Sequence, residues 1–196
     1  MDESDSRSAI KQLASDLLVQ HGYRGMRYAE IAAQLGITRA NIHYHFGSKS
    51  ALVDEVLADY VAATLGSLRE VWADEGTSLA DKLSQMMVLS RQRYDRFNAR
   101  GEPVRPWSLI SRLRQDQELL SATGRGLLAK FSTELHDVFA GALSRAAAAG
   151  EIRSDVEAAT TLLVAIADSA APITIAEGGF SGLEAAYGAL ARLTLR

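Results

Sequence analysis

The sequence contains no cysteine and only three prolines, and its start, MDESDSRS, is acidic. The absence of cysteine excludes disulfides, thiolate metal sites and cysteine nucleophiles, and it favours a reducing compartment, so we expect a cytoplasmic protein. An acidic start does not fit the basic front of a signal peptide. The longest apolar run, ATTLLVAIADSAAPITIA, is interrupted by Asp168 and Pro172, which argues against a membrane span and predicts no membrane partner.

The sequence also lacks any stretch in which apolar and polar residues alternate with a period of two, so no strand is expected. Alanine, leucine, arginine and glutamate are abundant and favour helices. We predict an all-α fold in which a small N-terminal three-helix domain is joined by a long helix to a larger helical bundle. The expected helices are 7–21, 27–35, 39–46, 50–72, 78–99, 106–114, 117–149, 155–177 and 183–193.

One weak point is expected in these helices, between Asp116 and Gly126, because Gly124 and Gly126 weaken a continuous helix. The pattern divides the chain functionally near residue 50. Residues 1–50 form the expected helix-turn-helix domain, and residues 51–196 form the expected ligand-binding and dimerisation domain.

Charge is distributed unevenly along the chain. The formal net charge is −3, which does not suit a general nucleic-acid coat protein. Between residues 20 and 50, however, Arg24, Arg27, Arg39 and Lys49 face a single acidic residue, Glu30. A small basic patch on an acidic body is typical of a protein that attracts phosphates with one face only.

Residues 37–52, ITRANIHYHFGSKSAL, raise the question of whether their rings are core, metal ligands or a binding surface. At about 100° per residue, a helix over 39–46 turns Ile42 and Phe46 toward the core. His43 and His45 then point about 200° apart and cannot hold one ion, so we expect no metal site and no cofactor.

The outward face of this helix carries donors instead. Its residues, Arg39, Asn41, His43 and Tyr44, can donate to phosphates, and all but the tyrosine can also address base edges. The preceding helix is joined to it by the tight turn QLGIT, and Thr38 stands at the N-cap position. This is the helix-turn-helix arrangement, whose second helix enters the major groove of double-stranded DNA.

The stretch GYRGMRYAEIAAQLGITRANIHYHFGSKSALVDEVL resembles the DNA-binding domain of the TetR family of transcriptional regulators. The resemblance covers about a quarter of the chain and implies that Arg39 and Ala40 approach base edges. It implies phosphate contacts for His43, Tyr44, His45 and Lys49, and Asn41 lies on the same face. Thr38 would cap the helix and touch the DNA backbone.

Two positions depart from the family pattern. His43 stands where the family often has tyrosine, so this phosphate contact is expected to depend on pH. Met26 and Arg27 stand where a threonine often opens the second helix, so the cap is lost and Arg27 is expected to supply the phosphate contact by charge.

The resemblance also implies a small-molecule pocket and a dimer in the rest of the chain. Methionines, aromatics and a hydroxyl suit an apolar or aromatic effector, although the same residues equally describe a filled core. The candidate ligand residues are Met86, Ser90, Tyr94, Trp107, Phe131 and Leu135. The last two expected helices are rich in small and apolar residues and are the expected homodimer interface. Asp168, inside the first of them, is either a buried hydrogen-bonded residue or a pocket group.

The sequence therefore predicts a ligand-responsive transcriptional regulator that binds a pseudo-palindromic operator as a homodimer. We expect this regulator to be a repressor. Two alternatives stay open. One is a helical binding module whose N-terminal bundle docks a protein instead of DNA. The other is an α-helical enzyme, for which no nucleophile and base stand at a telling spacing, so we expect no enzyme.

Overall fold

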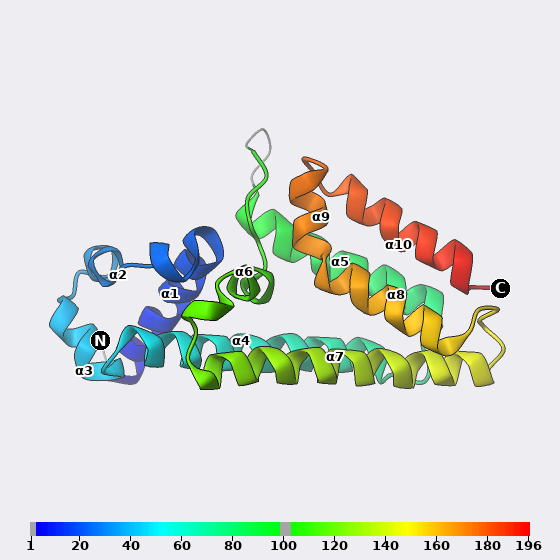
Figure 1. Ribbon diagram of the computed structural model, residues 1–196, viewed down its shortest axis with the longest axis horizontal. Coiled ribbons are helices and arrows are strands. Elements are labelled where there is room, and N and C mark those ends of the chain that lie inside the picture. Colours follow the sequence, from blue (N-terminus) through cyan, green and yellow to red (C-terminus); the bar gives the residue numbers. More distant parts are fainter. Residues whose placement is uncertain (1–2, 99–102) are drawn as a thin grey trace. The chain divides into compact units, whose positions relative to one another are not determined.

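The structure of the protein, a computed structural model, describes residues 3–98 and 103–196. The predicted all-α fold is confirmed (Figure 1). Within the described ranges, the one pairing of extended segments is an isolated antiparallel bridge between Ile152 and Leu195. The helices are α1 (Glu3–Gly25), α2 (Tyr28–Leu35), α3 (Arg39–Phe46), α4 (Lys49–Trp72), α5 (Leu79–Phe97), α6 (Leu109–Gln115), α7 (Ala122–Ala148), α8 (Val156–Asp168), α9 (Ala170–Ala176) and α10 (Ser181–Thr194), with a 3-10 turn at Gln117–Leu119.

The described chain separates into two compact units. The first holds the residues up to Ala62 together with Ser108–Ala129, so α6 and the start of α7 pack with α1, α2, α3 and the start of α4. The second holds the remaining described residues. These units are defined by packing alone, so the functional division at residue 50 stays a prediction.

In the first unit, the end of α1 is shaped by Gly22, which leaves helical geometry at φ 69°, ψ −174°. This conformation favours glycine because it needs a positive φ. The Asp116 carboxylate, just beyond α6, accepts a hydrogen bond from the Tyr23 amide at 2.8 Å. A Cβ atom on Gly22 would overlap this carboxylate and the Arg112 guanidinium, so the lack of a side chain also makes room for α6.

In the second unit, α4 and α7 meet at the rings of Trp72 and Phe139, whose centroids lie 4.6 Å apart in an edge-to-face arrangement. Both residues are fully buried. Further along the chain, α10 packs against α5, α8 and α9 (Figure 1). Within the described residues no single helix has both the length and the apolarity to cross a bilayer, and only the bent pair α8 and α9 passes that test of length and composition.

Two predicted helices are broken in the structure. The predicted helix 117–149 is interrupted at Leu120, which is extended at φ −78°, ψ 152°, before α7 begins. There the Ser121 hydroxyl accepts from the Gly124 amide at 2.9 Å and donates to the Asp54 carboxylate on α4. The break thus falls inside the expected weak point, but a serine cap and a partner on another helix define it.

The predicted helix 155–177 divides at Ser169 into α8 and α9, which are bent by 60°. Pro172 lies in the first turn of α9, where a backbone N–H has no partner within the helix. In the interior of a continuous helix, the same proline would remove a backbone hydrogen bond. Asp168 is the last residue of α8 and is half-buried.

The remaining boundaries differ less. Helix α6 begins at Leu109 instead of Pro106, because the Ser108 hydroxyl caps it by accepting from the Ser111 amide at 3.2 Å. Helix α5 begins after Ser78 as expected, while its predicted end at Ala99 lies outside the described residues.

Candidate nucleic-acid interface

Helix α3 is built by strong local signals. Thr38 is its N-cap, and the Thr38 hydroxyl accepts from the Asn41 amide at 3.2 Å. In return the Asn41 side-chain oxygen accepts from the Thr38 amide at 3.0 Å, which completes a capping box. The predicted N-cap is therefore confirmed, and it fixes where the helix begins.

The two faces of α3 divide as the sequence predicts. Ile42 is 0% and Phe46 6% exposed, so both pack into the first unit. The opposite face is open, and Tyr44 is 77% exposed. The other exposed residues of the predicted DNA face are Arg39, Ala40, Asn41 and His43, and His45 is half-buried. One short helix thus presents hydrogen-bond donors to solvent on one face and is buried on the other.

The His43 ring is oriented by two neighbours. Its Nδ1 lies 3.2 Å from the Gly47 carbonyl oxygen and donates to it in the tautomer that carries a proton there. The ring packs edge-on against Tyr28 at a centroid distance of 5.0 Å. Burial, and next the neighbouring Tyr23, raise the pKa of Tyr28, which therefore stays neutral beside the imidazole.

The predicted basic contacts outside α3 differ from each other. Arg27 is exposed at the N-cap of α2, and its side chain makes no capping hydrogen bond, as the missing threonine predicts. Lys49 is half-buried, and its Nζ donates to the Met26 carbonyl at 2.7 Å and lies 4.9 Å from the centre of the Tyr23 ring. Burial, and next the charge of Arg27, lower the pKa of the Lys49 ammonium. Lys49 thus ties the turn after α1 to the start of α4.

Sequence reasoning missed Arg7. Its Nη1 donates to the His45 carbonyl, its Nη2 pairs with both carboxylate oxygens of Glu55, and its guanidinium lies 4.3 Å from the centre of the Phe46 ring. A signal was present, because Arg7 and Lys11 are four residues apart and face Glu55 and Asp59, which are also four apart. Opposite charges with matched helical spacing indicate two helices that pack side by side.

The candidate effector residues are packed in the second unit. Five of the six are buried and Tyr94 is half-buried. The Trp107 indole donates to the Thr174 hydroxyl at 2.8 Å, and the Tyr94 ring lies 6.3 Å from Trp107 and 5.2 Å from Phe180. The residues are Met86, Ser90, Tyr94, Trp107, Phe131 and Leu135.

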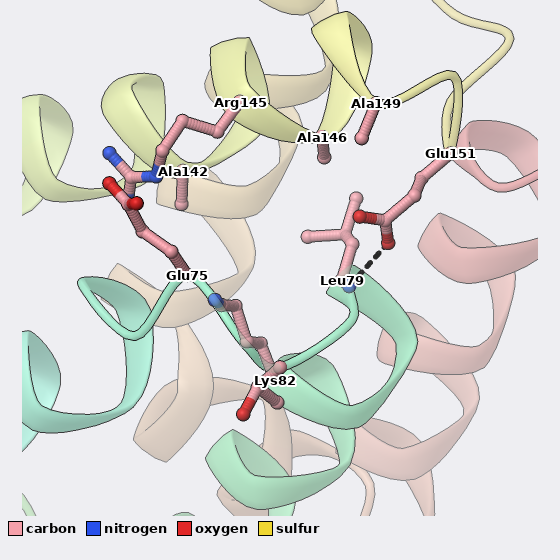
Figure 2. Close-up of a pocket in the computed structure, with 9 residues that line it drawn as sticks. Glu75, Leu79, Lys82, Ala142, Arg145, Ala146, Ala149 and Glu151 are labelled. Carbon is pink, nitrogen blue, oxygen red and sulfur yellow. Dashed lines mark hydrogen bonds between the residues drawn. The ribbon is translucent and has the colours of Figure 1, made fainter.

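An open hollow of about 250 Å³ lies elsewhere in the second unit, between the alanines of α7 and the start of α5 (Figure 2). It includes none of the candidate effector residues. Its lining is Glu75, Thr77, Leu79, Lys82, Ala142, Arg145, Ala146, Ala149 and Glu151.

Three of the four charged side chains that line this hollow form hydrogen bonds at the ends of helices. Glu151 accepts from the Leu79 amide at 2.7 Å, at the start of α5. Arg145 donates to the Trp72 carbonyl at 2.8 Å, at the end of α4, and Lys82 donates to the Asp74 carbonyl just beyond it. Carboxylates at helix N-termini and cations at C-termini are stabilising without any ligand.

The fold and the exposed face of α3 define a class of protein: a DNA-binding protein of the helix-turn-helix type. Residues 10–56 match the family described as bacterial regulatory proteins, tetR family. The resemblance predicted from the sequence is thereby confirmed for these residues, which form a DNA-binding domain of this family of transcriptional regulators.

Similar proteins agree with this assignment. The chain is 26% identical over 156 residues to the HTH-type transcriptional repressor KstR2 of Rhodococcus jostii, covering 79% of this chain and 72% of that protein. It is 28% identical over 93 residues to KstR2 of Mycolicibacterium smegmatis, where it spans only 45% of the relative. The fold matches a TetR-family regulator from Agrobacterium tumefaciens with a TM-score of 0.86 at 22% identity, over 98% of this chain and 100% of that one. These proteins are named as regulators, and none of them supports the enzyme alternative.

Proposed function

We propose that this regulator is a repressor that binds a pseudo-palindromic DNA operator as a homodimer and responds to a small-molecule effector. The observation that carries the proposal is the face of α3, where Tyr44 is 77% exposed while Ile42 and Phe46 are buried. A capped helix with an open donor-rich face is suited to the major groove. The two KstR2 relatives named above are themselves called repressors. A cytoplasmic location, where bacterial DNA lies, belongs to the same proposal.

In this proposal the residues divide between base edges and phosphates. Arg39 and Ala40, in the first turn of α3, approach base edges, because the N-terminal residues of a recognition helix enter the groove first. Asn41 stands beside them. The phosphate contacts come from the other donors around α3, which are Arg27, Thr38, His43, Tyr44, His45 and Lys49.

The homodimer is proposed to form through the last helices of the chain. Large apolar side chains are exposed on all three of them: Leu162 on α8 is 45%, Ile175 on α9 42% and Leu193 on α10 63% exposed. A second copy would remove these side chains from water, and two-fold symmetry would match two recognition helices to two half-sites.

The effector is proposed to be apolar or aromatic and to bind among the candidate residues of the second unit. Because these residues are buried, a ligand must open the packing there, for example around Trp107, which is 4% exposed. Helices α4 and α7 each contribute to both units, so a ligand that acts on them in the second unit acts on helices of the first. A typical coupling of about 1–3 kcal/mol would change operator affinity by roughly 5–150-fold.

The experiment that tests this proposal is selection of bound duplexes from a random DNA pool by the purified protein at physiological salt. An enriched inverted repeat is the expected result, since it reports both base readout and dimer symmetry. If the folded protein enriches no sequence, with or without candidate effectors, the repressor proposal fails. Affinity for DNA that does not change with salt would instead favour a protein-docking module, because each phosphate contact contributes a log–log slope of about −0.9.

A further inference from the structure

The N-terminal helix α1 reaches the recognition helix through the side chain of Arg7. Its guanidinium reaches the C-terminal end of α3, where Nη1 donates to the His45 carbonyl. The same group lies 4.3 Å from the centre of the Phe46 ring and pairs with Glu55 on α4, with Nη2 at 2.5 and 2.6 Å from the two carboxylate oxygens. Arg7 therefore links α1, α3 and α4 at a single point.

Each of these contacts has a physical use. The His45 carbonyl is among the last four of α3, which have no partner within their own helix, so the arginine supplies a missing donor. The cation over the ring of Phe46 holds the buried end of α3. Because Glu55 neutralises the guanidinium, its charge is compensated inside the protein before any DNA is present.

The two ends of α3 are thus held in different ways. The N-terminal end is fixed locally by the capping box of Thr38 and Asn41. The C-terminal end has a long-range tether, since Arg7 lies 38 residues before His45. A capping box is sufficient to start a helix, but it does not determine the angle at which that helix lies on its neighbours.

We propose that Arg7 is a positioning residue for DNA recognition, which fixes the angle of α3 through its carbonyl, ring and carboxylate contacts and does not bind phosphate. The inference rests on the proposed DNA-binding function. Base-edge contacts depend on placement of the helix within fractions of an ångström, whereas general attraction to phosphates does not. Loss of Arg7 therefore lowers affinity for the operator more than affinity for random DNA.

The chain contains a matched control one helical turn away. Lys11 on α1 pairs with Asp59 on α4 at 2.5 Å, so it joins the same two helices with the same pair of charges. Within the described residues, no hydrogen bond or ion pair joins Lys11 to α3. The variants Arg7→Met and Lys11→Met each remove one positive charge from α1 and one pairing with α4, and only the first removes the contacts with α3.

The test measures affinity by fluorescence anisotropy for the selected operator and for a scrambled duplex, over a range of salt concentrations. We expect Arg7→Met to weaken operator binding about tenfold, the scale of losing a hydrogen bond made by a charged group, while the salt slope stays unchanged. Lys11→Met is expected to leave the ratio of operator to scrambled affinity as in the wild type. Arg7→Lys, which keeps the charge but not the geometry, is expected to fall between them.

Three outcomes overturn the proposal. A salt slope reduced by about 0.9 in Arg7→Met shows a direct phosphate contact. Equal effects of Arg7→Met and Lys11→Met show a role for net charge or for the packing of α1 on α4. Full affinity and full operator preference in Arg7→Lys show that the geometry of the guanidinium is unimportant.

A second measurement separates failure of this inference from failure of the proposed function. Amide hydrogen exchange of the DNA-free protein is compared for the two methionine variants. Faster exchange confined to α3 in Arg7→Met is expected, and equal exchange in both variants overturns the positioning role. If the wild type selects no operator but α3 still loosens specifically, the proposed function fails while the tether stands.

Discussion

Arg39 is the first residue of α3, and its side chain is exposed. We expect Arg39→Ala to cost about 1–3 kcal/mol of binding free energy and to relax base preference at one step of the operator. Competition between duplexes that differ at single positions measures this directly. An unchanged preference at every step would mean that α3 is not the reading helix.

Lys49 has a structural contact in addition to its predicted phosphate contact. Its ammonium is already bonded to the Met26 carbonyl at 2.7 Å, so we expect Lys49→Ala to lower the free energy of unfolding by about 1 kcal/mol. We also expect this substitution to weaken binding to all DNA sequences alike, with a slope of log affinity against log salt concentration that is smaller by about 0.9. Denaturant titration and salt-dependent binding separate the two effects. A loss of stability with an unchanged slope would leave Lys49 as an internal tether only.

Tyr187 on α10 is 3% exposed, and its hydroxyl has no hydrogen-bond partner within the described residues. Burial raises the pKa of this phenol above its ordinary value. The folded state therefore keeps its proton while the unfolded state loses it above about pH 10, so stability is fully present below that pH and falls as the pH rises.

We expect Tyr187→Phe to be as stable as the wild type or more so at neutral pH, because the buried hydroxyl is unpaired. Above pH 10 its unfolding free energy should fall less steeply, by up to about 1.4 kcal/mol per pH unit. Denaturant unfolding at pH 8 and at alkaline pH checks both signs. Parallel curves for the two proteins would show that the phenol ionises equally in the folded and unfolded states.

At the scale of elements, the junction of α1 and α6 depends on Gly22. Its φ of 69° is unfavourable for a side chain, and a Cβ would overlap Asp116 and Arg112. We expect Gly22→Ala to lower the unfolding free energy by at least the roughly 1–3 kcal/mol attributed to a strained positive-φ backbone alone. Thermal unfolding measures this effect, and we expect the midpoint temperature of the variant to be lower than that of the wild type.

Gly126 in α7 is the matched control, because a Cβ there would meet nothing within 4 Å and its φ is not positive. Gly126→Ala should raise the unfolding free energy by about 0.5–1 kcal/mol, since glycine weakens a helix interior. The change in unfolding free energy is then expected to be negative for Gly22→Ala and positive for Gly126→Ala. A change of the same sign in both variants would mean that the fit between α1 and α6 does not constrain Gly22.

The short helices α2 and α3 of the helix-turn-helix domain could be predicted from sequence because their signals are local. The cap at Thr38, the left-handed Gly36 that ends α2 and the apolar pair Ile42 and Phe46 all act within a few residues of one another. The break before α7 was located only approximately. There the Ser121 hydroxyl donates a hydrogen bond to Asp54, which lies 67 positions away in the sequence. No local sequence pattern predicts such a partner.

At the scale of the whole molecule, the proposed homodimer predicts that exposed apolar side chains on the last helices are needed for assembly. Leu162 is 45% and Leu193 63% exposed. We expect the double variant Leu162→Glu, Leu193→Glu to be monomeric in sedimentation velocity and to lose most operator affinity, because one recognition helix reads only half a site.

Val88 on α5 provides the control for this experiment. It is 55% exposed, a fraction between those of Leu162 and Leu193, but it lies outside α8, α9 and α10. Val88→Glu should leave both the sedimentation behaviour and the operator affinity unchanged. A double variant that remains dimeric would place the interface elsewhere on the chain.

The sequence by itself determined the helical class, the helix-turn-helix register and the outward face of α3, because these depend on period, caps and turns within a few residues. Only the tertiary structure decided where the long helices break and which cations face inward. Arg7 and His45 are 38 residues apart, and Lys49 and Met26 are 23 apart. Contacts between such distant positions arise from packing, so neither the tether by Arg7 nor the hydrogen bond from Lys49 could be predicted from local sequence patterns.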